Sequence, residues 1–285
     1  MTLITRRVAT AGLLATGAFT RAQDAPRRVV SIGSCLDVML LDLADRDQIV
    51  AVTHFARDAD VSTIAARARD LPFTHETVEE VMALKPDLVL ASKRTALQTR
   101  TTLKAFGVRV VEFPVSESVA ASLDQVRQVA ALLGHPGRGE ALVGRIERAV
   151  AKAEAKPGER PLKALVYQSN GLVAGKGTLV GEMLERCGFE NVAGRYGLKK
   201  WGNVSLEQLL ADPPEVLLAG EAWSGAPTWA DRTIRHPALQ SLEPRTFRAS
   251  FHQRLLYCGG PVLIDTAAAL RKARREAQAW ASRRP

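Results

Sequence analysis

The sequence predicts an α/β protein of two lobes. Each lobe is a parallel sheet covered by helices, one long rigid helix joins the lobes, and a ligand cleft lies between them. Short segments rich in Val, Ile and Leu alternate with segments of helical periodicity, as in parallel sheets buried on both faces. One helix–strand unit recurs 128 residues further along the chain. A long helical stretch without internal turn residues separates the two copies.

Four apolar segments in the first half of the chain predict buried strands, because each is short, rich in branched residues and bounded by turn residues. They are residues 28–33, 48–53, 87–92 and 109–114. Helical periodicity between them predicts helices over residues 36–44, 77–84 and 95–106. This alternation favours parallel pairing, since parallel neighbours need a crossover connection.

The second half of the chain repeats the alternation. Strands are expected over residues 163–169, 215–220 and 246–251, and helices over residues 179–187, 206–211 and 262–279. A chain of 285 residues has room for two lobes of ordinary domain size.

Between the halves, residues 138–156 predict a helix about 29 Å long. Its apolar residues recur at helical spacing, at Leu142, Ile146, Ala149, Val150 and Ala153. We therefore expect an N-terminal lobe over residues 23–136, a bridging helix over 137–157 and a C-terminal lobe over 158–285. A surface helix of one large domain would show the same pattern and stays an alternative.

The internal repeat aligns residues 78–92 (VEEVMALKPDLVLAS) with residues 206–220 (LEQLLADPPEVLLAG). Each copy has a short helix, a proline break and a buried strand. Thr77-x-x-Glu80 and Ser205-x-x-Gln208 are both typical of a capping box at the helix start. The two lobes therefore look like related units.

Each of these helices carries an acid in its first turn, at Glu79 and Glu207. An acid there stabilises a helix by about 0.3–1 kcal/mol through the helix dipole, so both glutamates have a purely structural explanation. One acid per lobe would also suit a partner that has two equivalent basic sites.

The net charge of +9 does not indicate a nucleic-acid partner. Residues 1–22 contribute +3 and residues 271–285 contribute +5, so the rest of the chain is nearly neutral. A nucleic-acid binder would be expected to carry its basic excess on a folded face. No apolar run reaches the roughly 18–20 residues that span a bilayer.

Residues 1–22 predict an export signal. Arg6-Arg7 precedes a mildly apolar stretch over residues 8–19, and small residues at Thr20 and Ala22 precede the expected cleavage site. The paired arginines indicate the twin-arginine route, and an ordinary secretory signal with two charges stays open. We expect a periplasmic protein, free of a lipid anchor because no Cys follows the cleavage site.

Three cysteines, Cys35, Cys187 and Cys258, allow at most one intramolecular disulfide. A Cys187–Cys258 bond is possible in an oxidising compartment, although sequence alone does not fix the geometry. No CxxC motif is present to indicate a structural zinc or a redox site.

Four segments carry a family resemblance: RVVSIGSCLDVMLLDL, VEEVMALKPDLVLAS, GTLVGEMLERCGFENVA and VSLEQLLADPPEVLLAG. In this order around one long helix, they resemble the periplasmic substrate-binding proteins of ABC importers for ferric siderophores, haem and cobalamin. The resemblance implies two α/β lobes bridged by one helix, with ligand in the cleft between them. It also implies that a glutamate on each lobe docks onto arginines of the dimeric permease, and the matching positions are Glu79 and Glu207.

Ligands of open α/β sheets bind beyond the carboxyl ends of the strands, so the loops there supply the candidate ligand-binding residues. Aromatic and basic groups that meet across a cleft suit a large flat or anionic chelate. The candidates are Ser34, Cys35, His54, Phe55, Arg57, His75 and Arg94 in the first lobe, and Trp201, Trp223, Trp229, His252, Arg254 and Tyr257 in the second.

Each candidate also has an ordinary explanation. A tryptophan can be a core residue, and His54 and His75 can be solvated loop residues. His252 and Tyr257 could be axial ligands if the cargo were haem, or could equally lie on the rim of the cleft.

The main alternative function is an exported α/β enzyme. The sequence has no G-x-S-x-G elbow, no HExxH and no G-x-G-x-x-G opening a helix. A binder of bare metal would need three or four converging ligands, and the five histidines are scattered along the chain. We therefore expect a monomeric binding protein, not an enzyme, with no resident cofactor and no metal site. It would deliver a metal chelate, a ferric siderophore first of all, or a tetrapyrrole to an ABC permease dimer in the inner membrane.

Overall fold

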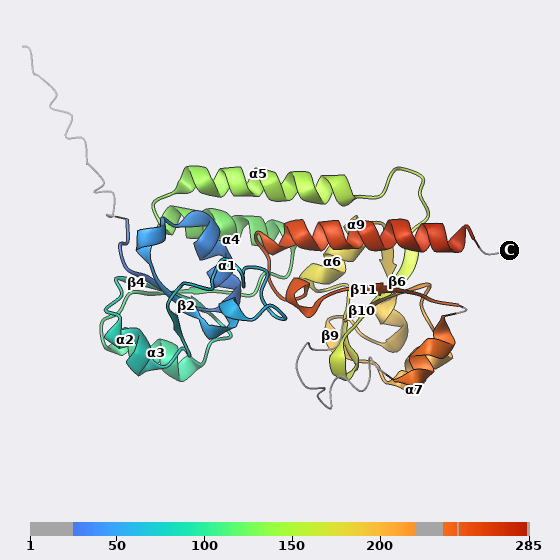
Figure 1. Cartoon of the computed structure of the whole chain (residues 1–285), viewed down its shortest axis with the longest axis horizontal. Coiled ribbons are helices and arrows are strands. Elements are labelled where there is room, and N and C mark those ends of the chain that lie inside the picture. Colours follow the sequence, from blue (N-terminus) through green and yellow to red (C-terminus); the bar gives the residue numbers. More distant parts are fainter. Residues whose placement is uncertain (1–24, 221–235, 244, 284–285) are drawn as a thin grey trace, which may run out of the picture.

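A computed structural model of the chain describes residues 25–220, 236–243 and 245–283. The predicted export signal and two of the ligand candidates, Trp223 and Trp229, lie outside these residues. Figure 1 shows two α/β lobes side by side, with long helices running along one side of both. The predicted fold class is confirmed.

The first lobe contains a five-stranded parallel sheet in the order β3-β2-β1-β4-β5. Its four predicted strands are present, and their branched residues are largely buried. The two-residue strand β3 was not predicted, because it is too short to show a period of two. The bounds are β1 Val29–Ile32, β2 Ile49–Thr53, β3 Phe73–Thr74, β4 Leu88–Ser92 and β5 Val110–Phe113.

The second lobe contains a six-stranded sheet in the order β11-β10-β6-β7-β9, with β8 also paired to β6. The three expected strands, β6, β10 and β11, pair in parallel. Three short strands were not predicted: β8 is parallel to β6, whereas β7 and β9 are antiparallel to their neighbours. The chain reverses directly after β6, where Asn170 and Gly171 have φ of 58° and 70°. The bounds are β6 Leu162–Tyr167, β7 Leu172–Ala174, β8 Phe189–Asn191, β9 Trp201–Asn203, β10 Val216–Ala219 and β11 Phe247–Ser250.

The helices fall into two groups. In the lobes lie α1 Ser34–Leu43, α2 Val78–Ala83, α3 Leu97–Ala105, α6 Leu179–Arg186 and α7 Leu206–Ala211. Along one side of both lobes run α4 Val119–Leu132, α5 Pro136–Ala153 and α9 Val262–Ala281, and α5 packs on both α4 and α9 (Figure 1). Helix α4 was not among the predicted elements.

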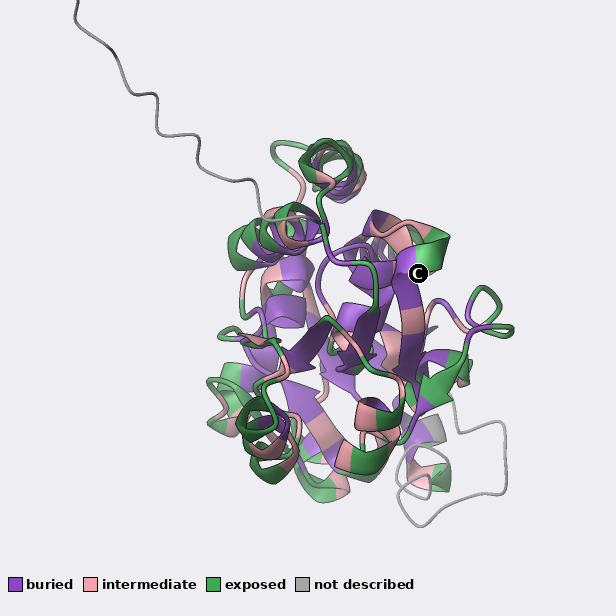
Figure 2. Ribbon diagram, turned by 90° about the vertical axis from the view of Figure 1, so that its left-hand side faces the viewer, coloured by how far each residue is buried: buried purple, intermediate pink, exposed green. Residues whose placement is uncertain are grey.

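The largest apolar core lies under this helical layer and is continuous from one lobe to the other. It joins Met39 of α1, Ile146 of α5, Val166 of β6 and Leu270 of α9. The opposite face of each sheet has a smaller core of its own. Figure 2 shows the sheets buried at the centre and the outer helix faces exposed. The two lobes therefore share one apolar core on the side that α5 covers.

The long central helix is present as α5. Its buried stripe includes Leu142, Ile146, Val150 and Ala153, at the predicted helical spacing. Gly139 allows α5 to approach α4 closely, because a Cβ there would lie 2.6 Å from the Cβ of Ala130. The domain boundaries drawn around this helix stay predictions.

The repeated unit has the same structure in both lobes. Helices α2 and α7 begin at Val78 and Leu206, and each is followed by an inner strand of its sheet. The aligned acids also act alike. Asp87 accepts the backbone N–H of Arg28 at 3.0 Å, before β1, and Glu215 accepts that of Lys163 at 2.8 Å, in β6. Each acid therefore fastens its own strand to the neighbouring one.

The cysteine pairing differs from the possibility left by the sequence. Cys258 forms a disulfide with Cys35, with the two Cα atoms 5.0 Å apart, and Cys187 is free and buried. Cys187 ends α6 inside the core, whereas Cys258 lies in the loop before α9, against the first lobe. The partners are 223 residues apart in sequence, which no local pattern could indicate.

Candidate functional site

A cleft of about 540 Å³ lies between the lobes, beyond the carboxyl ends of β1 and β4. The first lobe contributes Ile32, Ser92 and the segment Val115–Glu117 that follows β5. The second lobe contributes the start of α6, the first residue of β9, and Leu256–Tyr257 before α9. Its position matches the general rule for open α/β sheets.

Six of the predicted ligand residues line this cleft. Three of them, Ser34, Cys35 and Arg94, follow β1 and β4 directly, as the sequence analysis expected. The six are Ser34, Cys35, Phe55, Arg94, Trp201 and Tyr257. Cys35 is present as half of the disulfide, so it offers no free thiol to a ligand.

Trp201 and Tyr257 form an aromatic pair on the second-lobe wall. Their ring centroids are 5.4 Å apart at an interplanar angle of 34°, and each residue is 39% exposed. Burial raises the pKa of Tyr257, and the nearby charge of Arg94 opposes that rise. Such a pair offers a broad apolar surface with little conformational entropy to lose on binding.

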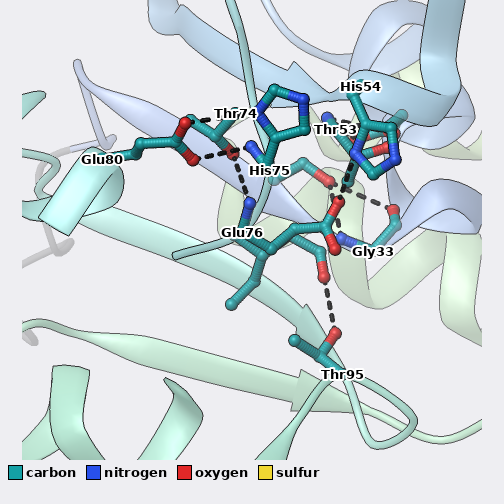
Figure 3. Close-up of polar contacts among 11 residues, drawn as sticks. Gly33, Thr53, His54, Thr74, His75, Glu76, Glu80 and Thr95 are labelled. Atoms are coloured by element: carbon teal, nitrogen blue, oxygen red, sulfur yellow. Dashed lines mark hydrogen bonds and ion pairs between the residues drawn. The ribbon is translucent and has the colours of Figure 1, made fainter. Parts of the chain in front are cut away.

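His54 and His75 do not line the cleft. They belong to a polar cluster at its first-lobe edge, shown in Figure 3. The ring centroids of the two histidines are 4.9 Å apart. His54 Nδ1 lies 3.4 Å from Glu76 Oε1, and His75 Nδ1 lies 3.3 Å from Glu80 Oε1. Each imidazole therefore contacts a carboxyl group of its own lobe.

Arg57, Arg254 and His252 also lie outside the cleft lining. Arg57 donates to the carbonyl of Arg69 at 2.5 Å, and its guanidinium sits 4.6 Å from the Phe73 ring centroid. Arg254 donates across the lobes to the carbonyl of Ala59 at 2.8 Å. Both arginines thus bind backbone carbonyls, a use that sequence spacing does not reveal.

The sequence analysis missed two acidic residues of the cleft, Glu76 and Glu117. Glu76 directly follows His75 and lies three residues before Glu79 in α2, and both of those residues were selected. Its position in the loop between them was the available signal. Glu117 lies in the segment after β5, where the same carboxyl-end rule applies. Lys200 of the second lobe holds Glu117 at 2.7 Å.

The floor of the cleft carries further links between the lobes. The Cys35–Cys258 disulfide is next to Tyr257, and the backbone N–H of Gly260 donates to Ser122 Oγ at 2.6 Å. Gly259 also faces Ser122, since a Cβ there would lie 2.3 Å from Ser122 Oγ. The two glycines therefore let the loop before α9 approach the first lobe closely.

Glu79 and Glu207 are exposed at the second positions of α2 and α7. Figure 1 shows both helices on the side of the molecule away from α5. A hydrogen bond from Ser205 holds the pKa of Glu207 below its usual range. Two equivalent acids therefore face outward, one per lobe.

The predicted capping boxes differ. Ser205 and Gln208 form the full reciprocal box at the start of α7. At α2, Thr77 caps the backbone N–H of Glu80, but the Glu80 carboxylate accepts from the backbone N–H of His75 at 2.7 Å instead of from Thr77. That bond lowers the pKa of Glu80 and ties the loop before α2 in place.

Within residues 25–220, 236–243 and 245–283, no helix is long and apolar enough to cross a membrane. Over the same ranges, no group of three or more His, Cys, Asp or Glu side chains is placed to hold a metal ion.

A family model described as periplasmic binding protein matches residues 29–244. A cobalamin-binding protein of Halobacterium salinarum is 27% identical over 202 residues, covering 68% of this chain and 54% of that protein. A vitamin B12-binding protein of Salmonella typhi is 32% identical over 152 residues, covering 51% of this chain and 56% of that protein. The matches thus span about half the length of these curated relatives.

Solved structures share the fold over nearly their whole length. A periplasmic haem-binding protein of Roseiflexus sp. RS-1 has a TM-score of 0.69 at 24% identity, covering 87% of this chain and 98% of that one. A periplasmic vitamin B12-binding protein of Vibrio cholerae has a TM-score of 0.65 at 18% identity, covering 89% and 98%. These relatives carry the names of binding proteins, which leaves the exported-enzyme alternative without support. The chain belongs to the periplasmic binding protein family.

Proposed function

We propose that this chain is the extracytoplasmic solute-binding component of an ABC importer, with a tetrapyrrole or a metal chelate as its cargo. The observation that carries the proposal is the cleft between the lobes, in which the Trp201–Tyr257 pair and Arg94 line one cavity. An aromatic surface and a cation that has no side-chain partner among the described residues suit a large flat molecule that carries an anionic group.

The size of the cleft suits a small-molecule ligand. Its volume of about 540 Å³ lies within the usual range of small-molecule and cofactor pockets. Curated relatives are named for binding cobalamin, and neighbours in fold for binding haem, vitamin B12 or ferric hydroxamate. A lone ferric ion does not fit, because the described residues offer no ligand cluster.

The partner in this proposal is a dimeric permease, and Glu79 and Glu207 are the residues that dock onto it. Both glutamates are exposed, occupy equivalent helices and lie on the side away from α5. Export through the predicted signal would place the protein in the periplasm. The remaining described candidates support the cleft walls in this proposal; they are His54, His75, Arg57, His252 and Arg254.

Charge reversal tests the docking role. Glu79→Arg and Glu207→Arg should each leave cargo affinity unchanged and lower uptake in cells by at least about tenfold, because each places like charges together at the permease. Glu147→Arg is the matched control, since Glu147 is exposed on α5. Unchanged uptake in both docking variants would contradict the proposal.

A further inference from the structure

Glu76 is held in the cleft by an unusual backbone conformation. It lies in the short loop between β3 and α2, lines the cleft, and has φ of 60°, which L-residues rarely adopt. Hydrogen bonds fix this conformation: Glu76 N–H donates to Thr74 Oγ1 at 3.3 Å, and His75 N–H donates to Glu80 at 2.7 Å. A strained residue held so firmly at a cleft is a candidate for a direct role in binding.

The Glu76 carboxyl group is poorly satisfied within the described structure. Its Oε1 atom is buried and accepts no hydrogen bond there. The nearest partner is His54 Nδ1, 3.4 Å away and itself without a hydrogen bond, and Figure 3 shows the carboxyl group turned toward this ring. Burial raises the pKa of Glu76, while His54 opposes the rise. The side chain as a whole is 22% exposed and lines the cleft, so the other carboxyl oxygen is the one that can accept a hydrogen bond from a ligand.

The other charged groups of the cleft are placed differently. Glu117 is neutralised by Lys200, whose Nζ lies 2.7 Å from its Oε1. Arg94 has no side-chain partner among the described residues, and it follows β4. Glu76 follows β3, and β2 and β1 lie between those two strands in the sheet. The first-lobe wall therefore has an acid at one side and a free cation at the other.

We propose that Glu76 is a specificity-determining residue, and that it selects cargo presenting carboxamide or ammonium hydrogen-bond donors over cargo presenting carboxylates. This rests on the proposed function, which places the cargo in this cleft. In a tetrapyrrole with amide side chains and one phosphodiester, an amide N–H would donate to Glu76. The phosphodiester anion would pair with Arg94. A tetrapyrrole with two propionates would set a second carboxylate against Glu76, and the two like charges would repel each other.

The test compares two tetrapyrroles on the mature chain. Cyanocobalamin has amide side chains, and haemin has two propionates. Affinities at pH 7.5 are measured by calorimetry for cyanocobalamin and by absorbance titration for haemin. The variants are Glu76→Gln, which keeps an acceptor without the charge, and Glu76→Leu, which removes both. Glu147→Gln is the matched control, because it removes an exposed carboxylate on α5 that does not line the cleft.

The wild type should bind cyanocobalamin more tightly than haemin. Glu76→Leu should weaken cyanocobalamin by about 10- to 100-fold, as expected for loss of a hydrogen bond to a charged group. Glu76→Gln should keep cyanocobalamin within about tenfold and strengthen haemin by about tenfold or more, and Glu147→Gln should match the wild type. If the wild type binds either probe and both Glu76 variants leave the affinity ratio within about twofold, the selectivity proposal is overturned. If the folded wild type binds none of cyanocobalamin, haemin and ferrichrome, the proposed function is overturned instead.

Discussion

Cys35 and Cys258 join the two lobes covalently at the floor of the cleft. Cys35 lies at the start of α1 and lines the cleft, and Cys258 follows Tyr257 in the loop before α9. The bond therefore fixes Tyr257, and with it the aromatic pair, relative to the first lobe. The disulfide therefore limits how far the two lobes can separate at this end of the cleft.

Reduction of the disulfide should destabilise the protein. A cross-link between residues so far apart in sequence is expected to contribute about 2–5 kcal/mol to the free energy of unfolding. Urea unfolding with and without a phosphine reductant measures it. The double variant Cys35→Ser/Cys258→Ser should show the same loss and no further response to reductant. Cys187→Ala should still respond, and a response equal in all three proteins would refute the assignment.

Cys187 should be unreactive in the folded protein. It is fully buried, and burial raises the pKa of its thiol to about 12, so almost no thiolate is present at neutral pH. A thiol titration without reductant should give no reaction in the native state and one thiol after unfolding in guanidinium. Three reactive thiols after unfolding would show that no disulfide is present.

Asp37 should make the protein less stable as pH rises. It is fully buried on α1, where Thr53 donates to it through Oγ1 at 2.5 Å, and burial raises its pKa to about 7. Its contribution to stability is complete below about pH 4 and is lost as pH rises through 7, because only the unfolded chain ionises easily. The loss amounts to at most about 4 kcal/mol.

Asp37→Asn tests this dependence, since an amide cannot ionise. Unfolding free energies of the variant and wild type are compared at pH 4, 6 and 8. The difference should shift in favour of the variant as pH rises. A difference independent of pH would mean that Asp37 has an ordinary pKa in the folded protein.

The aromatic pair should supply much of the cargo affinity. Trp201→Ala and Tyr257→Ala should each weaken the bound cargo by about tenfold or more, because each removes a large apolar surface from the cleft. Trp280→Phe is a suitable control, since Trp280 lies on α9 against Phe247, outside the cleft. Affinity unchanged in both cleft variants would place the cargo elsewhere.

The sequence was sufficient where local patterns decide structure. Apolar periodicity located β1, β2, β4, β5 and α5, and the repeat located α2 and α7 with their exposed glutamates. Six of the eleven described ligand candidates, chosen by the carboxyl-end rule, line the cleft, and their contact with a ligand stays a prediction.

The remaining features depend on contacts between distant segments. The antiparallel β7 follows from a turn at Asn170–Gly171, and the Cys35–Cys258 pairing follows from how the lobes pack. Arg254 was selected as a ligand residue because it is basic and follows the carboxyl end of β11. Its guanidinium instead donates to the backbone carbonyl of Ala59 in the other lobe. Glu76 was overlooked because only the folded loop turns it into the cleft.

Cargo binding by the purified mature chain tests the central claim most directly. Cyanocobalamin, haemin and ferrichrome are each titrated at neutral pH, with tryptophan fluorescence and calorimetry as readouts. The account predicts saturable binding of one of them at a one-to-one ratio and micromolar affinity or tighter, with affinity weakened in Trp201→Ala. Folded protein that gives neither heat nor quenching with any of the three, or that binds one equally well without Trp201, would contradict it.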